Sequence, residues 1–148
     1  MSLAANQNDS SSQINLGFIY SEGKYIEQDI NKAIYYFTLA AKQNDWQAYF
    51  NLGIIYHEGK FVPRDINRAI YYYTIAANQN KACDQYNLGT IYYQGKYISQ
   101  DINKAIHYFT LAANQNHSLS QYNLGIIYYS GKYIEKDINK AIHYFTLA

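Results

Sequence analysis

The apolar residues of this chain recur with the spacing of an α-helix. Leu16, Ile19 and Tyr20 stand at i, i+3 and i+4. A second apolar set with the same rhythm comprises Ile30, Ala33, Ile34, Phe37 and Ala41. This spacing places apolar side chains on one face of a helix. The pattern therefore predicts two helices, called here helix A (residues 11–22) and helix B (residues 30–44).

Residues at the ends of these segments set the expected boundaries. Gly23 should end helix A, because glycine takes the left-handed conformation of a helix stop without strain. The Asp29 carboxylate can cap the free N–H groups at the start of helix B. Asn44 should end helix B, since asparagine is the next best residue at a left-handed stop. Only six residues, 24–29, lie between the helix stop at Gly23 and the start of helix B, so we expect an antiparallel hairpin.

The whole hairpin recurs with a period of 36 residues. Its clearest marks are four glycines, Gly17, Gly53, Gly89 and Gly125. A period in the thirties is typical of a stacked array, in which each unit covers the apolar face of its neighbour. We therefore predict an all-α fold of four helix-turn-helix repeats. The predicted boundaries are 9–44, 45–80, 81–116 and a truncated 117–148, with 1–8 as the end of a preceding repeat or a tag.

Glycine inside a helix needs a reason, because it costs ~1 kcal/mol relative to alanine. Gly17 lies within the predicted helix A. We expect it to allow close packing of helix A on helix B, with Ala33 and Ala40 as the small residues opposite. A phosphate-binding loop is not indicated, since such loops place glycine before a helix.

The best-defined candidate binding surface is the side of helix A that faces away from its core residues, called here the helix A stripe. A constant asparagine runs along it, at Asn15, Asn51, Asn87 and Asn123. Variable neighbours on the stripe include Phe18, Ile54, Thr90 and Ile126, with Glu58 one turn beyond Ile54. Flanking pairs are Ile14 and Ser21, Phe50 and His57, Tyr86 and Tyr93, and Tyr122 and Tyr129.

An amide offers both donors and an acceptor, so a constant asparagine suits a constant partner such as peptide backbone. The variable neighbours would then select side chains. The alternative is that each asparagine bonds the backbone of the adjacent repeat and holds the stack.

No motif for catalysis, cofactor binding or metal binding stands out. The sequence lacks a nucleophile elbow, His-Glu-x-x-His, paired Cys-x-x-Cys and a Gly-rich phosphate loop. His107 and His143 share one repeat position, on helices too far apart for two imidazoles to hold a metal alone. We therefore predict no catalytic residues, no cofactor and no metal. Cys83 falls on the helix A stripe, where we expect its thiol to be accessible.

Charge and hydropathy narrow the class of partner. The formal net charge is +1, with acidic and basic residues interspersed, which argues against a nucleic-acid partner. The longest apolar runs are far too short to cross a membrane, and the first residues do not resemble a signal peptide. We expect a soluble protein without membrane insertion. Its compartment stays undefined.

The repeated string Asn-Leu-Gly-x-x-Tyr-x-x-Gly-Lys-x-(Ile/Val)-x-x-Asp-x-x-(Lys/Arg)-Ala-x-x-Tyr-x-x-x-Ala-Ala resembles the Sel-1-like repeat, a relative of the tetratricopeptide repeat. The resemblance covers essentially the whole chain. It implies a right-handed α/α superhelix that acts as an adaptor and binds proteins along a concave face lined by helix A. A secreted branch of the family staples each repeat with a disulfide, but this chain has only Cys83.

Together these observations predict a protein-protein interaction scaffold that binds a protein or peptide and performs no catalysis. Two alternatives stay open: an enzyme or binder acting on cell-wall peptide or sugar, and a purely structural spacer. Neither end of the chain shows a polar cap repeat. We therefore expect the chain to come from a longer array, and its open ends to favour weak end-to-end self-association.

Overall fold

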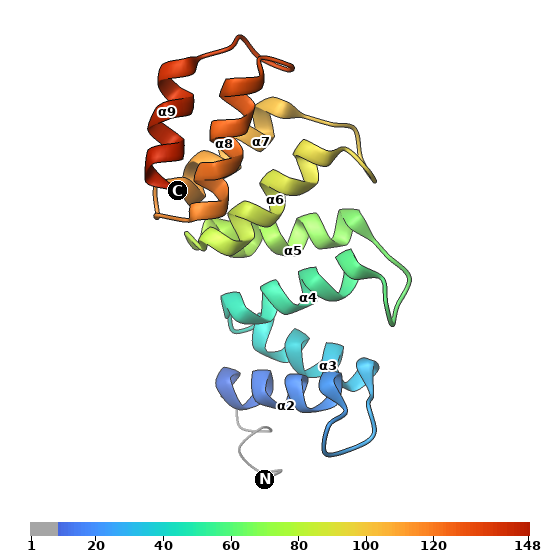
Figure 1. Ribbon diagram of the computed structural model, residues 1–148. Coiled ribbons are helices and arrows are strands. Elements are labelled where there is room, and N and C mark those ends of the chain that lie inside the picture. The colour runs from blue at the N-terminus through green and yellow to red at the C-terminus, as the bar shows by residue number, and fades with distance from the viewer. Residues whose placement is uncertain (1–8) are drawn as a thin grey trace. The chain divides into compact units, whose positions relative to one another are not determined.

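The computed structural model describes residues 9–148, and all the regular structure in this part is α-helical (Figure 1). The helices are α2 (Ser10–Glu22), α3 (Ile30–Ala41), α4 (Trp46–Glu58), α5 (Ile66–Asn78), α6 (Ala82–Gln94), α7 (Ile102–Ala113), α8 (Ser118–Ser130) and α9 (Ile138–Leu147). The predicted all-α class is confirmed. The predicted segment 1–8 lies outside the described residues.

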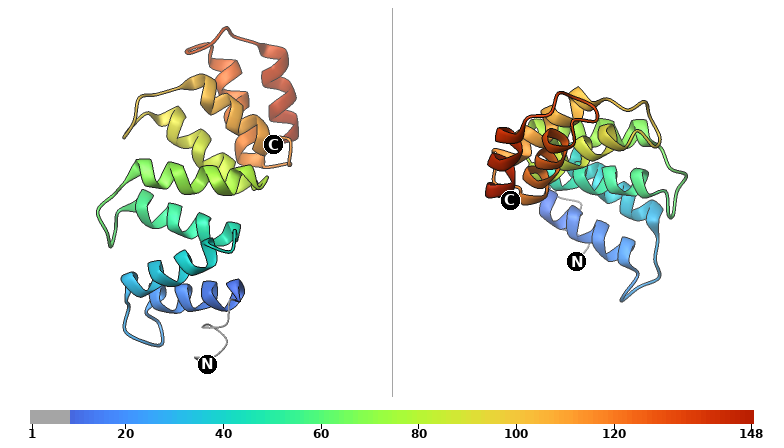
Figure 2. Two further views of the ribbon diagram at one scale, coloured as in Figure 1. Left: turned by 180° about the vertical axis from the view of Figure 1, so that it is seen from behind. Right: turned by 45° about the horizontal axis from the view of Figure 1, so that its top comes forward.

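The chain divides into two compact units, residues 1–76 and 77–148, and each is described by itself. The first unit holds α2, α3, α4 and most of α5. The second holds α6 to α9. Within the first unit, the loops from α2 to α3 and from α4 to α5 leave along the same edge (Figure 2).

Local sequence explains the helix ends. An oxygen of the Asp29 carboxylate accepts the backbone N–H of Lys32 at 3.0 Å, which caps α3 as predicted. Helix α2 ends at Gly23, whose φ of 64° is left-handed. Asn44 is also left-handed, with φ 61°, and Asn80 and Asn116 repeat this conformation. The regular part of α3 ends earlier than predicted, at Ala41, and a turn leads from there to Asn44.

Each unit has an apolar core between its helices. In the first unit α3 packs against both α2 and α4, and the buried residues are Ile14, Ala33, Phe37, Ala40, Ala41, Ala48 and Leu52. In the second unit α7 packs against both α6 and α8, and α8 packs on α9. Ala105, Phe109, Ala113, Leu124 and Ile127 form its buried cluster. Ile14, expected beside the helix A stripe, is therefore a core residue.

The helical glycines lie against aromatic rings. A Cβ added to Gly17 would stand 2.5 Å from Cε1 of Phe37, closer than real Cβ contacts allow. The predicted close approach of helix A to helix B is thus present, and the atoms nearest the glycine belong to Phe37 and not to Ala33 or Ala40. A large flat ring, not a small side chain, fills the space above the glycine. The same contact recurs with Tyr73, Phe109 and Phe145 above the other three glycines.

Side chains near the start of helix A also secure the end of the preceding helix B. The Tyr49 hydroxyl donates to the Ala41 carbonyl at 2.8 Å, and Gln121 Nε2 donates to the Ala113 carbonyl at 3.2 Å. These carbonyls end a helix, and each also accepts a backbone N–H from the turn that follows, from Asn44 at 2.9 Å and from Asn116 at 3.0 Å. The bonds from Tyr49 and Gln121 tie each repeat to its successor within a unit.

Many of the tyrosines are structural. Tyr20 and Tyr36 stack with ring centroids 5.7 Å apart and planes 7° from parallel. Tyr92 and Tyr108 repeat this stack at 6.0 Å. The ammonium of Lys32 lies 5.1 Å from the Tyr20 centroid. These stacked pairs join helix A to helix B inside each repeat.

Candidate functional site

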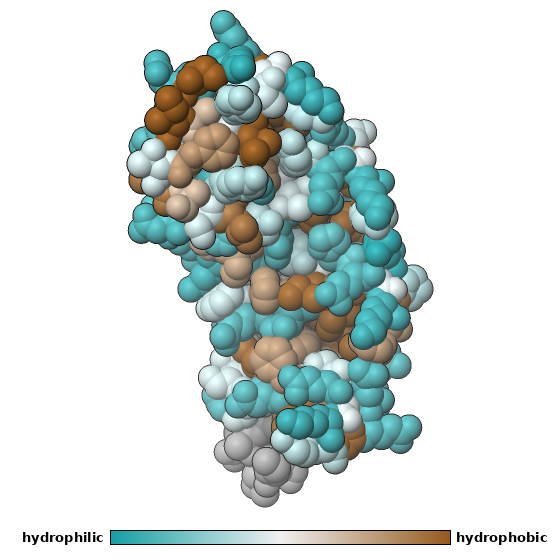
Figure 3. Space-filling view, viewed as in Figure 1, coloured by the Kyte–Doolittle hydropathy of each residue, from teal (hydrophilic) through white to brown (hydrophobic). Residues whose placement is uncertain are grey.

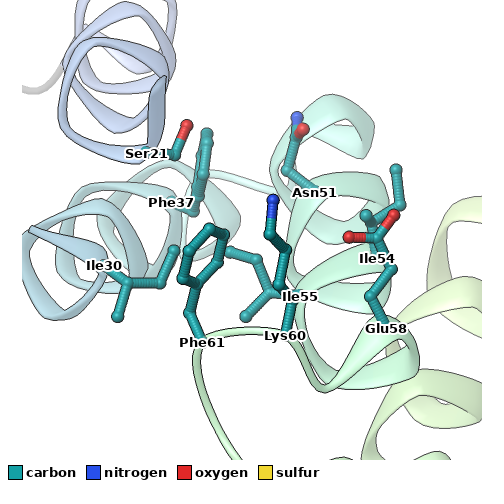
Figure 4. Close-up of a pocket in the computed structure, with 9 residues that line it drawn as sticks. All are labelled: Ser21, Ile30, Phe37, Asn51, Ile54, Ile55, Glu58, Lys60 and Phe61. Carbon is teal, nitrogen blue, oxygen red and sulfur yellow. The ribbon is translucent and has the colours of Figure 1, made fainter. Parts of the chain in front are cut away.

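The helix A stripe of the first unit borders a pocket of about 190 Å³ (Figure 4). Three residues that the sequence interpretation placed on the stripe line it: Asn51, Ile54 and Glu58. The other lining residues come from three helices and one loop: Ser21, Ile30, Phe37, Ile55, Lys60 and Phe61. Of these, only Ser21 had been placed beside the stripe.

The pocket has aromatic and aliphatic walls and a polar rim. Phe37, whose ring lies over Gly17, also meets Phe18 edge to face at 5.5 Å. Phe61 arrives from the loop between α4 and α5, and the Lys60 ammonium lies 4.8 Å from its ring centroid. Figure 4 shows the Lys60 chain pointing toward the Asn51 amide. This arrangement suits an apolar group with polar atoms at its edge.

Asn51 is half-buried, and its amide nitrogen donates to the Gln47 carbonyl of its own helix at 2.7 Å. The alternative role, in which the asparagine holds the stack, requires a bond to the adjacent repeat. The Asn51 bond stays within its own helix and does not supply one. The amide oxygen is then the atom that a partner's N–H could meet. Asn15 is exposed, while Asn87 and Asn123 are half-buried.

His57 is engaged within the first unit. It is half-buried, and Nδ1 lies 3.3 Å from the Tyr73 hydroxyl oxygen. Burial lowers the pKa of His57, and the nearby Arg64 charge lowers it further. The ring is therefore neutral at physiological pH. Phe50, its partner in the predicted pair, meets Trp46 with centroids 6.4 Å apart.

Two aromatic residues that flank the stripe in the second unit, Tyr86 and Tyr93, pack on the core residue Phe109. Tyr86 lies 6.0 Å from Phe109 and 4.9 Å from the His117 ring. Tyr93 contacts both Phe109 and Tyr133. Tyr122 and Tyr129 are more than half exposed. The hydroxyl of Thr90 is shielded without a hydrogen-bond partner in the described structure, and Ile126 is half-buried.

Two neighbouring groups on α6 have strongly shifted acidity. Burial raises the pKa of Asp84 to about 7, and one of its carboxylate oxygens has no hydrogen-bond partner in the described structure. Burial also raises the pKa of the Cys83 thiol to about 11. Cys83 is half-buried and not freely accessible, although its position on the stripe suggested otherwise.

Metal-binding clusters and membrane-spanning helices are two further features that the described structure addresses. Residues 9–148 contain no cluster of three or more His, Cys, Asp or Glu side chains placed to hold a metal ion. Of the helices in the same range, none has the length and apolar run needed to cross a bilayer.

Stacked helix hairpins with a repeated core define a helical repeat protein of the solenoid class. The chain belongs to the Sel1 repeat family, whose profile matches residues 10–45, 46–81, 84–117 and 118–148. Members of this family are generally scaffolds for protein interactions and generally non-catalytic.

Solved structures show the same fold. A protective antigen of uropathogenic Escherichia coli with an SLR fold aligns at 29% identity and a TM-score of 0.91, over 97% of this chain and 31% of the antigen. A Sel1 repeat protein from Oxalobacter formigenes aligns at 30% identity and a TM-score of 0.83, over 95% of this chain and 58% of that protein. The chain thus spans about a third of the antigen and somewhat over half of the Oxalobacter formigenes protein. No curated protein matches it significantly.

Proposed function

We propose that this chain is a protein-interaction scaffold that holds an extended peptide segment along the helix A stripe. The observation that carries the proposal is the pocket in the first unit, where Asn51 and Ile54 stand beside the rings of Phe37 and Phe61. Apolar walls supply affinity for a side chain, and the amide at the rim supplies a hydrogen bond to backbone.

The expected length of the peptide follows from repeat geometry. Stacked helices lie ~8–10 Å apart, which matches about three residues of extended chain at ~3.3 Å each. The two repeats of one unit would then contact roughly six residues. A polypeptide partner also suits the near-neutral charge of the chain better than a nucleic acid does.

A displayed library of random peptides, each roughly ten residues long, tests this function. Peptides selected on the chain should bind several-fold more weakly to the double variant Asn51→Ala, Asn87→Ala, because each unit then loses a stripe asparagine whose amide would bond the peptide backbone. The matched control is Asn67→Ala, Asn103→Ala, which removes two exposed asparagines from helix B. Equal loss in both variants, or no loss in either, would refute binding along the helix A stripe.

A second, weaker contact is proposed at α9. Its exposed apolar residues are Ile138, Ile142, Phe145 and Leu147, and apolar side chains gather over this helix in Figure 3. Phe145 is 38% exposed, whereas Phe37 at the same repeat position is 1% exposed. In the first unit α4 packs on the equivalent helix α3. We propose that a second copy of this chain covers α9 at high concentration, and sedimentation across a concentration series tests it.

A further inference from the structure

Among the positions at which the two units differ, one lines the pocket and decides how much of it is filled. Ser21 of the first unit corresponds to Tyr93 of the second, two repeats further along. Around this position the chain repeats itself closely: Phe37 corresponds to Phe109, and Phe61 to Tyr133. Each unit therefore places two aromatic rings, one from helix B and one from a loop, next to this position of helix A.

In the second unit, the chain itself supplies an aromatic ring between these two walls. The Tyr93 ring lies 6.4 Å from Phe109 and meets Tyr133 edge to face, with centroids 6.0 Å apart and planes at 82°. Edge-to-face contact at this separation is a favoured geometry for aromatic pairs.

In the first unit the corresponding side chain is a serine, which supplies no ring between Phe37 and Phe61. The Ser21 hydroxyl turns back and donates to the Phe18 carbonyl at 3.0 Å. A pocket of about 190 Å³ stays open between Phe37 and Phe61. For comparison, a protein cavity of roughly 150 Å³ lined by apolar side chains holds a benzene molecule. The space is therefore large enough for one aromatic ring.

We propose that this pocket receives the aromatic side chain of a partner peptide, in the place that Tyr93 fills in the second unit. The inference rests on the proposed function and makes it specific: the first unit binds a phenylalanine or tyrosine side chain of the peptide. Ile30 and Ile55 complete the apolar lining, and Asn51 with Lys60 stands at the rim for the polar atoms of the same residue.

The test uses the full chain and a small probe, N-acetyl-L-phenylalaninamide, followed by amide shifts in ¹H–¹⁵N NMR spectra. The probe should shift residues that line the pocket, and N-acetyl-L-leucinamide should bind several-fold more weakly because it lacks a ring. Ser21→Tyr should weaken binding roughly tenfold or more, since its ring occupies the pocket. Ser21→Ala, which leaves the pocket open, should bind as the parent does.

Two further variants keep the inference falsifiable if Ser21→Tyr does not fold. Tyr93→Ser should open a second site, seen as new shifts around Phe109 and Tyr133. Phe61→Ala removes an exposed wall of the pocket and should weaken binding several-fold. Equal binding of the two probes, or binding that Ser21→Tyr and Phe61→Ala both leave unchanged, would overturn the assignment.

The failures of the two proposals are distinguishable. Selected peptides that depend on Asn51 and Asn87 but not on Ser21→Tyr would leave the scaffold function standing and remove the aromatic pocket. A probe that binds at the pocket while no peptide is selected would leave the aromatic pocket standing and remove the scaffold function.

Discussion

The rings of His57 and Tyr73 meet edge to face at 82°, and their polar atoms are hydrogen-bonded. Tyr73 is fully buried at a repeat position that is phenylalanine elsewhere. His57 stands where the other repeats have Ser21, Tyr93 and Tyr129. The histidine thus occurs in the one repeat whose core ring carries a hydroxyl. We infer that its role is to give this buried hydroxyl a hydrogen-bond partner.

Replacing Tyr73 with phenylalanine should lower the free energy of unfolding by about 1 kcal/mol, because the half-buried His57 loses a hydrogen bond. Urea denaturation measures the change. A double-mutant cycle with His57→Ser, the residue of the first repeat, isolates the pair. A coupling energy of zero would show that the two side chains do not interact.

Gly53→Ala should destabilise the chain although alanine is the better helix former. The added Cβ would stand 2.5 Å from Cε1 of Tyr73, so the buried ring must move. Overpacking of this kind costs about 1–3 kcal/mol, against a helix-propensity gain of up to about 1 kcal/mol. Gln47→Ala, at an exposed position of the same helix, is the control and should be nearly neutral. A gain in thermal stability for Gly53→Ala would contradict the described packing.

Asp84 should make the stability of the chain depend on pH. The folded carboxyl keeps its proton up to about pH 7, whereas the usual pKa is 3.8, so the folded state binds more protons between these values. Stability must then fall as the pH rises through this window.

Asp84→Ser, which introduces the residue type found at Ser120 of the fourth repeat, should remove this penalty. At about pH 8 the variant should gain on the order of 2–4 kcal/mol relative to the parent, and below about pH 4 it should gain far less. Urea denaturation at both pH values measures the difference, in which the titration of other groups cancels. A variant that is equally stable to the parent at both values would show that Asp84 ionises normally.

Cys83 should react slowly with thiol reagents in the folded chain. Its pKa is raised from 9.0 to about 11, which reduces the thiolate about a hundredfold at neutral or mildly alkaline pH. The rate of thiol labelling, measured by mass spectrometry, should therefore rise sharply when denaturant is added. Rapid labelling of the native chain would instead place the thiol on an open surface.

The sequence predicts the helix ends well because they depend on local residue type. The left-handed backbone at each helix stop is tolerated by few residue types, so glycine and asparagine mark it, as at Gly23 and Asn44. Asp29 caps its helix because its carboxylate reaches the nearby N–H groups. The ring over Gly17 was not predicted, since small residues were matched with small ones. The direction in which Phe37 leans decides that contact.

The candidate site was harder to predict because it depends on side chains from three helices and a loop. The sequence marked Asn51 and Ile54, but Phe61 and Lys60 reach the pocket from the following loop. One signal was available in the repeat alignment: Ser21 is small where Tyr93 is large. Likewise, the histidine at position 57 and the tyrosine at position 73 depart from the repeat pattern together, which could have identified the pair.

The central claim is that the helix A stripe holds an extended peptide, and hydrogen exchange of the chain with and without a selected peptide tests it most directly. The account predicts slower exchange in α4, around Asn51 and Ile54, and in the loop that carries Phe61. Helix B residues such as Tyr71, exposed on α5, should exchange at the same rate in both states. Slower exchange confined to the helix B side, with α4 unchanged, would contradict it.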